Sequence, residues 1–165
     1  NGCRSLKKVI LPKDLVTVGR SMFENCTQLT NIALPLTIAQ ISSRAFFGTA
    51  IDILTIPNTS TLIESAFGNS PILKYIFLPI GYNSNANFLT SYNSLTKECL
   101  IDIATALQDN STTQTIKTIT FSQYAKKVFT TTYLDEQGNE VAYGTEGAVT
   151  LLQFITNKNW TVSFS

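Results

Sequence analysis

The sequence repeats itself about every 22 residues, and this repetition constrains the fold more than any other feature. The segment from Cys26 to Pro35 matches the segment from Cys3 to Pro12 at its apolar positions and at its proline. The same frame recurs twice more, so that its prolines are Pro12, Pro35, Pro57 and Pro79. Self-similarity at this period is typical of a solenoid, in which each repeat buries its apolar side by stacking on the next.

The second half of each repeat agrees as well. An Ala-Phe or Met-Phe pair follows each of the first three prolines, at residues 22–23, 45–46 and 66–67. Assembled, the unit reads L-x-x-I-x-L-P-x-x-L-x-x-I-x-x-x-A-F-x-x-C. This unit resembles the BspA-like leucine-rich repeats of bacterial surface proteins, and the resemblance covers about half of the chain as repeats.

The alternation of apolar and polar residues before each proline predicts a strand with one buried face. We expect these strands, at residues 6–12, 29–34, 51–56 and 73–78, to pair in parallel as one continuous sheet. A second apolar cluster in each repeat, at residues 16–18, 38–41 and 62–63, should form the opposite wall. The Phe of each pair should fill the space between the walls, and the Ala should permit a tight turn beside it.

The pattern changes after Pro79. Residues 80–88 are rich in Gly and Asn and are interpreted as a loop that leaves the last regular repeat. The apolar spacing then predicts a helix from Lys97 to Gln108, with Thr96 as its N-cap and Glu98 in its first turn. Residues 116–121 restore the L-x-x-I-x-L frame, so we expect a further strand that continues the same sheet.

The rest of the chain predicts a second helix and a closing strand. A polar segment at residues 133–141, centred on Gly138, suggests a hairpin-like excursion. A helix is expected at residues 146–156 with Thr145 as its cap. The alternating Trp160, Val162 and Phe164 predict a final strand, and residues 157–162 resemble the segment that follows the repeats in many members of the family.

These elements predict an α/β fold: a right-handed leucine-rich-repeat solenoid with a parallel sheet, capped at its C-terminal end by two helix–strand units. We assign residues 1–80 to the repeats and residues 81–165 to a cap that continues the solenoid.

The chain begins in the middle of a repeat, because its first residues correspond to residues 24–26 of the next one. We therefore expect it to be the C-terminal part of a longer protein.

The bulk properties exclude some classes of partner. The formal net charge is +1 and only 14% of residues are charged, which provides no basic field for nucleic acid. No apolar run approaches the ~20 residues that a membrane-spanning helix needs. Neither observation selects a partner.

Cys3 and Cys26 occupy the same position in successive repeats, and Cys99 is the third cysteine. Stacking would place the first two about 5 Å apart, which permits a disulfide. Two small buried thiols are the favoured interpretation, and the bond stays open at this stage. The odd number and the spacing indicate neither a disulfide framework nor a zinc site.

The sequence offers little for catalysis, and we expect no enzyme, no metal and no cofactor. There is no histidine, which removes the usual base of nucleophilic triads. Asp135, Glu136, Glu140 and Glu146 form one acidic stretch around Gly138, but its spacing departs from that of a calcium loop. A solvated turn is the favoured interpretation of this stretch.

Asn-x-Ser/Thr sequons, the acceptor sites of N-glycosylation, occur at Asn25, Asn58, Asn110 and Asn159.

The residues that alternate with the core positions should face solvent as two ladders. One contains Lys8, Asn31, Ile53, Tyr75 and Thr118, and the other contains Ile10, Ala33, Thr55, Phe77 and Thr120. From these ladders we take as candidate ligand-binding residues Lys8, Ile10, Asn31, Ile53, Thr55, Tyr75, Phe77 and Thr118.

Ile53, Tyr75 and Phe77 would form an apolar patch, and such a patch usually marks an interface. The alternative is that the C-terminal cap or residues 82–88 fold back and cover it.

The leading hypothesis is a non-catalytic recognition or adhesion module that binds a protein or a glycan through the sheet face of the solenoid. The resemblance implies a bacterial, extracellular or cell-surface location and adhesion to host or neighbouring-cell proteins, with extracellular-matrix proteins as the partners. We expect a monomer without a membrane span in this chain. The alternative is a structural spacer that carries another, catalytic domain of a larger surface protein.

Overall fold

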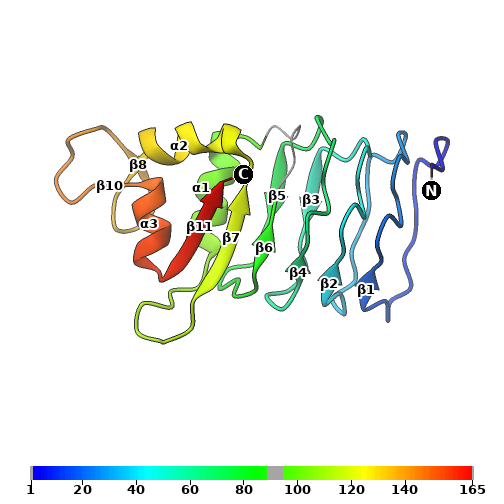
Figure 1. The fold of residues 1–165 in the computed structure, drawn as a ribbon, viewed down its shortest axis with the longest axis horizontal. Coiled ribbons are helices and arrows are strands. Elements are labelled where there is room, and N and C mark those ends of the chain that lie inside the picture. The colour runs from blue at the N-terminus through cyan, green and yellow to red at the C-terminus, as the bar shows by residue number, and fades with distance from the viewer. Residues whose placement is uncertain (1, 89–94, 165) are drawn as a thin grey trace.

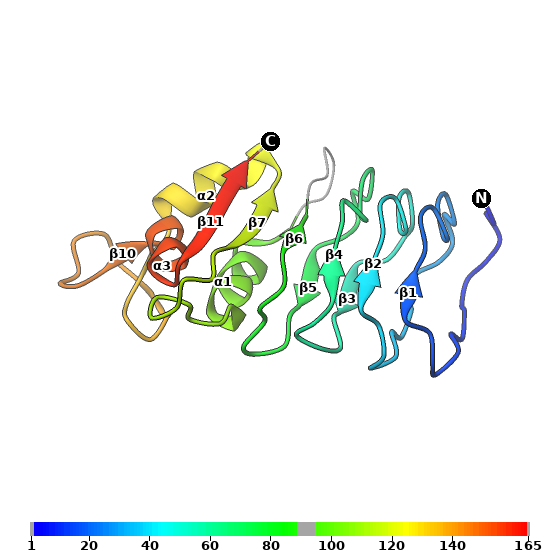
Figure 2. The same ribbon diagram turned by 60° about the horizontal axis from the view of Figure 1, so that its bottom comes forward.

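The computed structural model describes residues 2–88 and 95–164. These residues form an elongated stack of repeats, with the N-terminus at one end and the helices gathered at the other (Figure 1). Strands run across the stack on both sides, so that the repeats are enclosed between two walls (Figure 2). No helix within the described ranges is long and apolar enough to cross a membrane.

One wall is a six-stranded sheet in which every neighbouring pair is parallel. Its strands, in spatial order, are β1 (Thr17–Val18), β2 (Gln40–Ile41), β4 (Leu62–Ile63), β6 (Ala86–Asn87), β7 (Lys117–Phe121) and β11 (Trp160–Phe164). The first three come from the second apolar cluster of each repeat, and Val18, Ile41 and Ile63 are buried. The prediction of an opposite wall is confirmed.

The frame strands form the other wall in two pieces. β3 (Ile53–Thr55) pairs in parallel with β5 (Tyr75–Phe77), whereas Lys8 and Asn31 form only an isolated parallel bridge. The prediction of one continuous sheet is therefore wrong for the described residues. These strands stay short because the proline that follows each frame has no N–H with which to extend the ladder.

The strand expected at residues 116–121 lies on the wall opposite to the one predicted. It is β7, which pairs with β6 on one side and with β11 on the other. Helix α1 (Lys97–Ala106) packs against β5 and takes the place where a further frame strand would pair. The backbone N–H of Ile76 in β5 donates to Cys99 Sγ at 3.3 Å, and burial raises the pKa of that thiol to about 12.

The phenylalanines of the repeats fill the core between the walls, as predicted, and their rings stack on one another. Phe46 lies between Phe23 and Phe67, with ring centroids 5.7 and 5.8 Å apart and nearly parallel planes. Ala45 and Ala66 beside them are fully buried.

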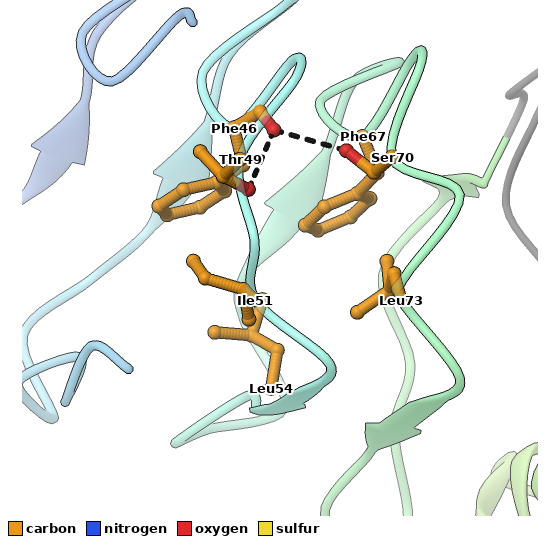
Figure 3. Close-up of a pocket in the computed structure, with 7 residues that line it drawn as sticks. All are labelled: Phe46, Thr49, Ile51, Leu54, Phe67, Ser70 and Leu73. Atoms are coloured by element: carbon orange, nitrogen blue, oxygen red, sulfur yellow. Dashed lines mark hydrogen bonds between the residues drawn. The ribbon is translucent and has the colours of Figure 1, made fainter. Parts of the chain in front are cut away.

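Figure 3 shows a gap within this core, where the rings of Phe46 and Phe67 lie on one side and aliphatic side chains on the other. The hydroxyls of Thr49 and Ser70, which occupy the same repeat position, both donate to the carbonyl of Phe46 (Figure 3). The gap has no room for a water molecule. It is part of the packing of the repeats and is not a ligand site.

Residues 80–88 are built into the stack, so their interpretation as a simple loop is wrong. Tyr82 is fully buried and its hydroxyl donates to the carbonyl of Thr61 at 2.5 Å. Ala86 and Asn87 form β6 of the six-stranded sheet. The ring of Tyr82 contacts Trp160, with ring centroids 6.5 Å apart.

The first C-terminal helix lies close to its predicted position: α1 spans Lys97–Ala106, and the prediction was Lys97 to Gln108. Thr96 is the N-cap of α1 and its hydroxyl accepts a hydrogen bond from the backbone N–H of Cys99. Glu98 lies in the first turn. The predicted hairpin is also present, as the antiparallel strands β8 (Tyr133–Leu134) and β9 (Glu140–Val141). Gly138 lies in its turn with a φ of +88°.

The second predicted helix begins later than expected. It is α3 (Leu151–Asn157), and Thr150 caps it through a capping box with Gln153. Val149 and Thr150 form strand β10 (Val149–Thr150), which pairs with β8 and prevents an earlier helical start. Thr145, the predicted cap, instead donates its hydroxyl to the carbonyl of Ala142 in a turn.

A short helical segment that the sequence pattern did not predict lies between β7 and β8. It consists of a 3₁₀ turn, η1 (Gln123–Ala125), and α2 (Lys126–Thr131). Phe129 of α2 is fully buried and contacts Phe121 and Phe164. The final strand, β11, agrees with the prediction.

Three consecutive side chains connect the end of the chain to the C-terminal end of α1 and to the segment that follows it. Lys158 Nζ donates to the carbonyls of Ala104, Thr105 and Leu107 at 3.0 to 3.2 Å. The Asn159 side-chain amide donates to carbonyls of that segment, and Trp160 Nε1 donates to the Gln108 carbonyl at 2.9 Å. We call this group, Lys158 with Asn159 and Trp160, the C-terminal clamp.

The cysteines are all free, so the alternative of a Cys3–Cys26 disulfide is absent from the structure. Cys26 is buried as expected, and burial raises the pKa of its thiol. Cys3 is exposed, contrary to the expectation of two buried thiols. Its repeat is the first in the stack, and no described repeat precedes it to cover it. The handedness of the winding and the division into residues 1–80 and 81–165 stay predictions.

Candidate binding face

The outward-facing residues of the frame strands lie side by side as the alternation predicted. Ile53 is the register partner of Tyr75, and Thr55 is the register partner of Phe77. Lys8 and Asn31 are joined by the parallel bridge. We call the exposed surface of Lys8, Ile10, Asn31, Ala33, Ile53, Thr55, Tyr75 and Phe77 the binding face.

Ile53, Tyr75 and Phe77 form the apolar centre of the binding face. The rings of Tyr75 and Phe77 contact each other, with centroids 4.5 Å apart and planes tilted by 34°. Side chains two residues apart on one strand point to the same side, which explains the contact. Ile53 keeps 52% of its surface exposed and Phe77 keeps 46%.

Among the described residues, the cap covers the tyrosine of this patch in part: Tyr75 is half-buried beside α1, whereas Ile53 and Phe77 stay exposed. The alternative in which the cap or residues 82–88 cover the whole patch is therefore wrong for the described residues. Tyr82 and Phe88 instead turn inward and are buried in the core. Helix α1 packs against β5, and its Asp102 contacts Tyr75 at the edge of the patch. Exposed aromatic side chains of this kind provide a large contact area at low entropic cost.

Asp102 of α1 fixes the tyrosine at the edge of the patch. Its carboxylate accepts a hydrogen bond from the Tyr75 hydroxyl. Burial and this neighbouring carboxylate raise the pKa of Tyr75 above its usual range, so the phenol stays protonated at neutral pH. No repeat pattern marks Asp102 as a neighbour of Tyr75, because the contact depends on how α1 packs against β5.

Thr118 does not belong to the binding face. It was predicted to extend the ladder of Lys8 and Tyr75, but it lies in β7 of the opposite wall, where it pairs with Thr161. Its backbone N–H donates to the side-chain oxygen of Asn85. Thr120, predicted for the second ladder, likewise faces Ser163 through a hydroxyl contact of 2.9 Å.

The acidic stretch is a hydrogen-bonded turn. The carboxylate of Asp135 accepts from the backbone N–H groups of Gln137 and Asn139 and from the Asn139 side chain. These bonds, the one from the Asn139 side chain first, lower the pKa of Asp135. Glu140 pairs with Lys97 at 2.8 Å.

These acidic residues do not converge on one point. Among the described residues, no group of three or more His, Cys, Asp or Glu side chains could hold a metal ion. The favoured interpretation as a turn agrees with this geometry.

Three of the sequon asparagines have structural roles. The Asn58 amide donates to the carbonyls of Leu36 and Ile38 in the preceding repeat. Asn110 is buried, and Asn159 belongs to the C-terminal clamp. Their side chains are engaged within the fold.

Comparison with known proteins gives one match. The family model described as "BspA type Leucine rich repeat region" matches residues 1–137 in six copies. This range exceeds the four repeats that the prolines mark and includes α1, β7 and α2. No curated protein and no solved structure matches the chain.

Proposed function

We propose, from the premise that the chain belongs to the BspA-type leucine-rich repeat family, that it is a non-catalytic recognition and adhesion module. It binds a protein or a glycan through the binding face, and it does so as a monomer on the outside of a bacterial cell. Members of such a family serve as surface repeats that bind proteins. Residues 81–165 close the right-handed solenoid as a cap.

The observation that carries this proposal is the exposed patch of Ile53, Tyr75 and Phe77. Ile53 and Phe77 are exposed and the Tyr75 ring is half-buried. Removing this apolar surface from water on contact with a partner would favour binding. The patch lies on rigid strands, and Asp102 holds Tyr75 in place. A partner would therefore meet a preorganised surface, which lowers the entropic cost of binding.

The engagement of Asp135 and Glu140 within the fold supports the absence of catalysis. A fold by itself does not determine function, so the assignment depends on a binding test.

The test is a binding screen of the purified chain against extracellular-matrix proteins, a glycan panel and the surfaces of partner bacteria. Any ligand found is then measured with the Tyr75→Ala/Phe77→Ala double variant. We expect at least a tenfold loss of affinity, because interfacial aromatic anchors contribute about 2 kcal/mol or more each. Phe77→Ala alone, which leaves the Tyr75–Asp102 hydrogen bond in place, should give a smaller loss.

The matched control is Tyr124→Ala/Tyr143→Ala, which removes two rings that are 72% and 83% exposed and lie outside the binding face. Its affinity should stay within about twofold of the unchanged chain. Thermal unfolding of all variants checks that they are folded. Equal affinity of the double variant and the control would refute the proposed face, and a screen that finds no ligand would favour the spacer role instead.

A further inference from the structure

A hollow lies over the first two repeats of the binding face. In the ribbon, these repeats are at the end of the stack opposite the helices (Figure 1). Its volume is about 660 Å³, and it is lined by residues 7–11, 13 and 30–35. The outward-facing residues Lys8, Ile10, Asn31 and Ala33 are all part of its lining. The hollow therefore belongs to the same surface as the aromatic patch.

Three lysines border the hollow and no carboxylate does. Lys7, Lys8 and Lys13 are exposed. None of the ion pairs found within residues 2–88 and 95–164 involves them. Three neighbouring cations create a positive potential that attracts an anion. An anionic group bound here would gain ion pairs without breaking any that exist.

The first two repeats, which surround the hollow, carry a net positive charge. Residues 1–44 contain two acidic residues, Asp14 and Glu24, against six basic ones, Arg4, Lys7, Lys8, Lys13, Arg20 and Arg44. Glu24 is already paired with Arg44, so it does not neutralise the hollow. The positive potential is thus a property of this whole end of the molecule, although the net charge of the chain is only +1.

The aromatic pair lies three repeats further along the same face. Since neighbouring parallel strands are about 4.8 Å apart, Lys8 and Tyr75 are separated by ~15 Å along the stack. Asp52 is exposed beside Ile53, and Asp102 contacts Tyr75, so carboxylates flank this end. A ligand that follows the face must carry negative charge at the lysines and a neutral, partly apolar surface at the rings.

We propose that the binding face holds a linear anionic glycan. Its carboxylate or sulfate groups lie against Lys7, Lys8 and Lys13, and one of its sugar rings stacks on Tyr75 and Phe77.

A sugar ring offers C–H groups that pack on an aromatic face, and its hydroxyls match neutral hydrogen-bonding side chains such as Asn31 and Thr55. An acidic peptide would satisfy the lysines but has no ring of this kind to place on the aromatic pair. The inference rests on the proposed function, because it names the ligand class of the same face.

The test titrates the chain with a heparin hexasaccharide, and separately with a neutral dextran hexasaccharide and a short poly-glutamate peptide. We expect measurable binding of the heparin probe that weakens at about 0.3 M NaCl, because exposed ion pairs are screened by salt. The Lys7→Gln/Lys8→Gln/Lys13→Gln variant should lose about tenfold in affinity, the combined effect of three exposed ion pairs. The neutral dextran should bind more weakly than heparin.

The matched control is Lys117→Gln/Lys126→Gln/Lys127→Gln, which removes the same charge from β7 and α2, outside the binding face. Its affinity for heparin should stay within about twofold.

Two results would refute the proposed glycan ligand. One is that heparin does not bind, and the other is that both lysine variants lose the same affinity for heparin. Tighter binding of poly-glutamate that ignores Tyr75→Ala/Phe77→Ala would assign the hollow to an acidic protein segment instead. A ligand from the screen that needs the aromatic pair but not the lysines would refute the glycan and leave the proposed function standing.

Discussion

Lys158 of the C-terminal clamp allows the clearest test of how the end of the chain is held. Its ammonium donates to three carbonyls at the C-terminal end of α1 and lies 4.8 Å from the centre of the Phe154 ring. Helix α1 has no basic residue in its own last turn. Lys158 therefore supplies, from a distant part of the sequence, the cation that favours a helix C-terminus.

Replacing Lys158 with Met keeps the length of the side chain but removes the charge and all three hydrogen bonds. Hydrogen bonds to a charged group contribute about 1.5–3 kcal/mol, and a cation at a helix C-terminus about 0.3–1 kcal/mol. The half-buried ammonium also has a desolvation cost, which its lowered pKa shows to exceed the gain from the charge itself, so the expected loss comes from the three hydrogen bonds and from the carbonyls that Met would leave without a donor. We expect a net loss of about 2 kcal/mol in the free energy of unfolding.

Urea unfolding followed by tryptophan fluorescence measures this loss directly. The chain has a single tryptophan, Trp160, which is buried and belongs to the same clamp. A loss of about 2 kcal/mol should also lower the Tm by roughly 4–8 °C in a domain of this size. Lys127→Met, an exposed lysine in α2, is the matched control and should change stability by less than about 0.5 kcal/mol.

The pH dependence gives a second readout of the same contact. Burial lowers the pKa of Lys158 below its usual value, and Asp109 opposes this shift in part. The unfolded state then holds the proton more tightly than the folded state does. Stability should therefore rise as pH increases from the folded-state pKa towards about 10.4. Lys158→Met should lack this rise, and a variant as stable as the unchanged chain would refute the clamp.

Two further perturbations test the core and the ion pair between Glu24 and Arg44. Phe46→Ala, which removes the middle ring of the stack, should cost about 3–5 kcal/mol in urea unfolding, whereas Tyr124→Ala should cost less than about 0.5 kcal/mol. The hydrogen bond from Arg44 lowers the pKa of Glu24, so its stabilisation is present above pH ~4.3 and is lost as pH falls through the folded-state pKa. Glu24→Gln should flatten that acid slope and Glu146→Gln should not, as urea midpoints across this pH range would show.

The repeat frame predicted the core because a residue's place in the frame decides whether its side chain faces the core or the solvent. The positions of Leu54 and Ile76 follow from the alternation and that of Phe46 from the Ala-Phe pair, and all three are buried. The capping of α1 by Thr96 was equally local, since the hydroxyl needs only the backbone three residues on. Predictions of this kind require no knowledge of distant segments.

The candidate binding face was predicted in part. Ile53, Tyr75 and Phe77 are neighbours because their strands have the predicted parallel register. Thr118 was misplaced because the frame specifies a strand with one buried side and does not specify its partner. The contribution of Asp102 and the grouping of Lys7 with Lys13 around one hollow arise from packing between segments.

The sequence by itself determined the period of the repeat, the core position of its phenylalanines and the family to which the chain belongs. These features depend on residues that recur at fixed spacing, so each repeat carries the information for its own contacts. The tertiary structure decided which wall each C-terminal strand joins, where α3 begins and which carbonyls Lys158 binds. The physical reason is that these contacts join segments tens of residues apart, and their geometry is settled only when α1 packs against β5.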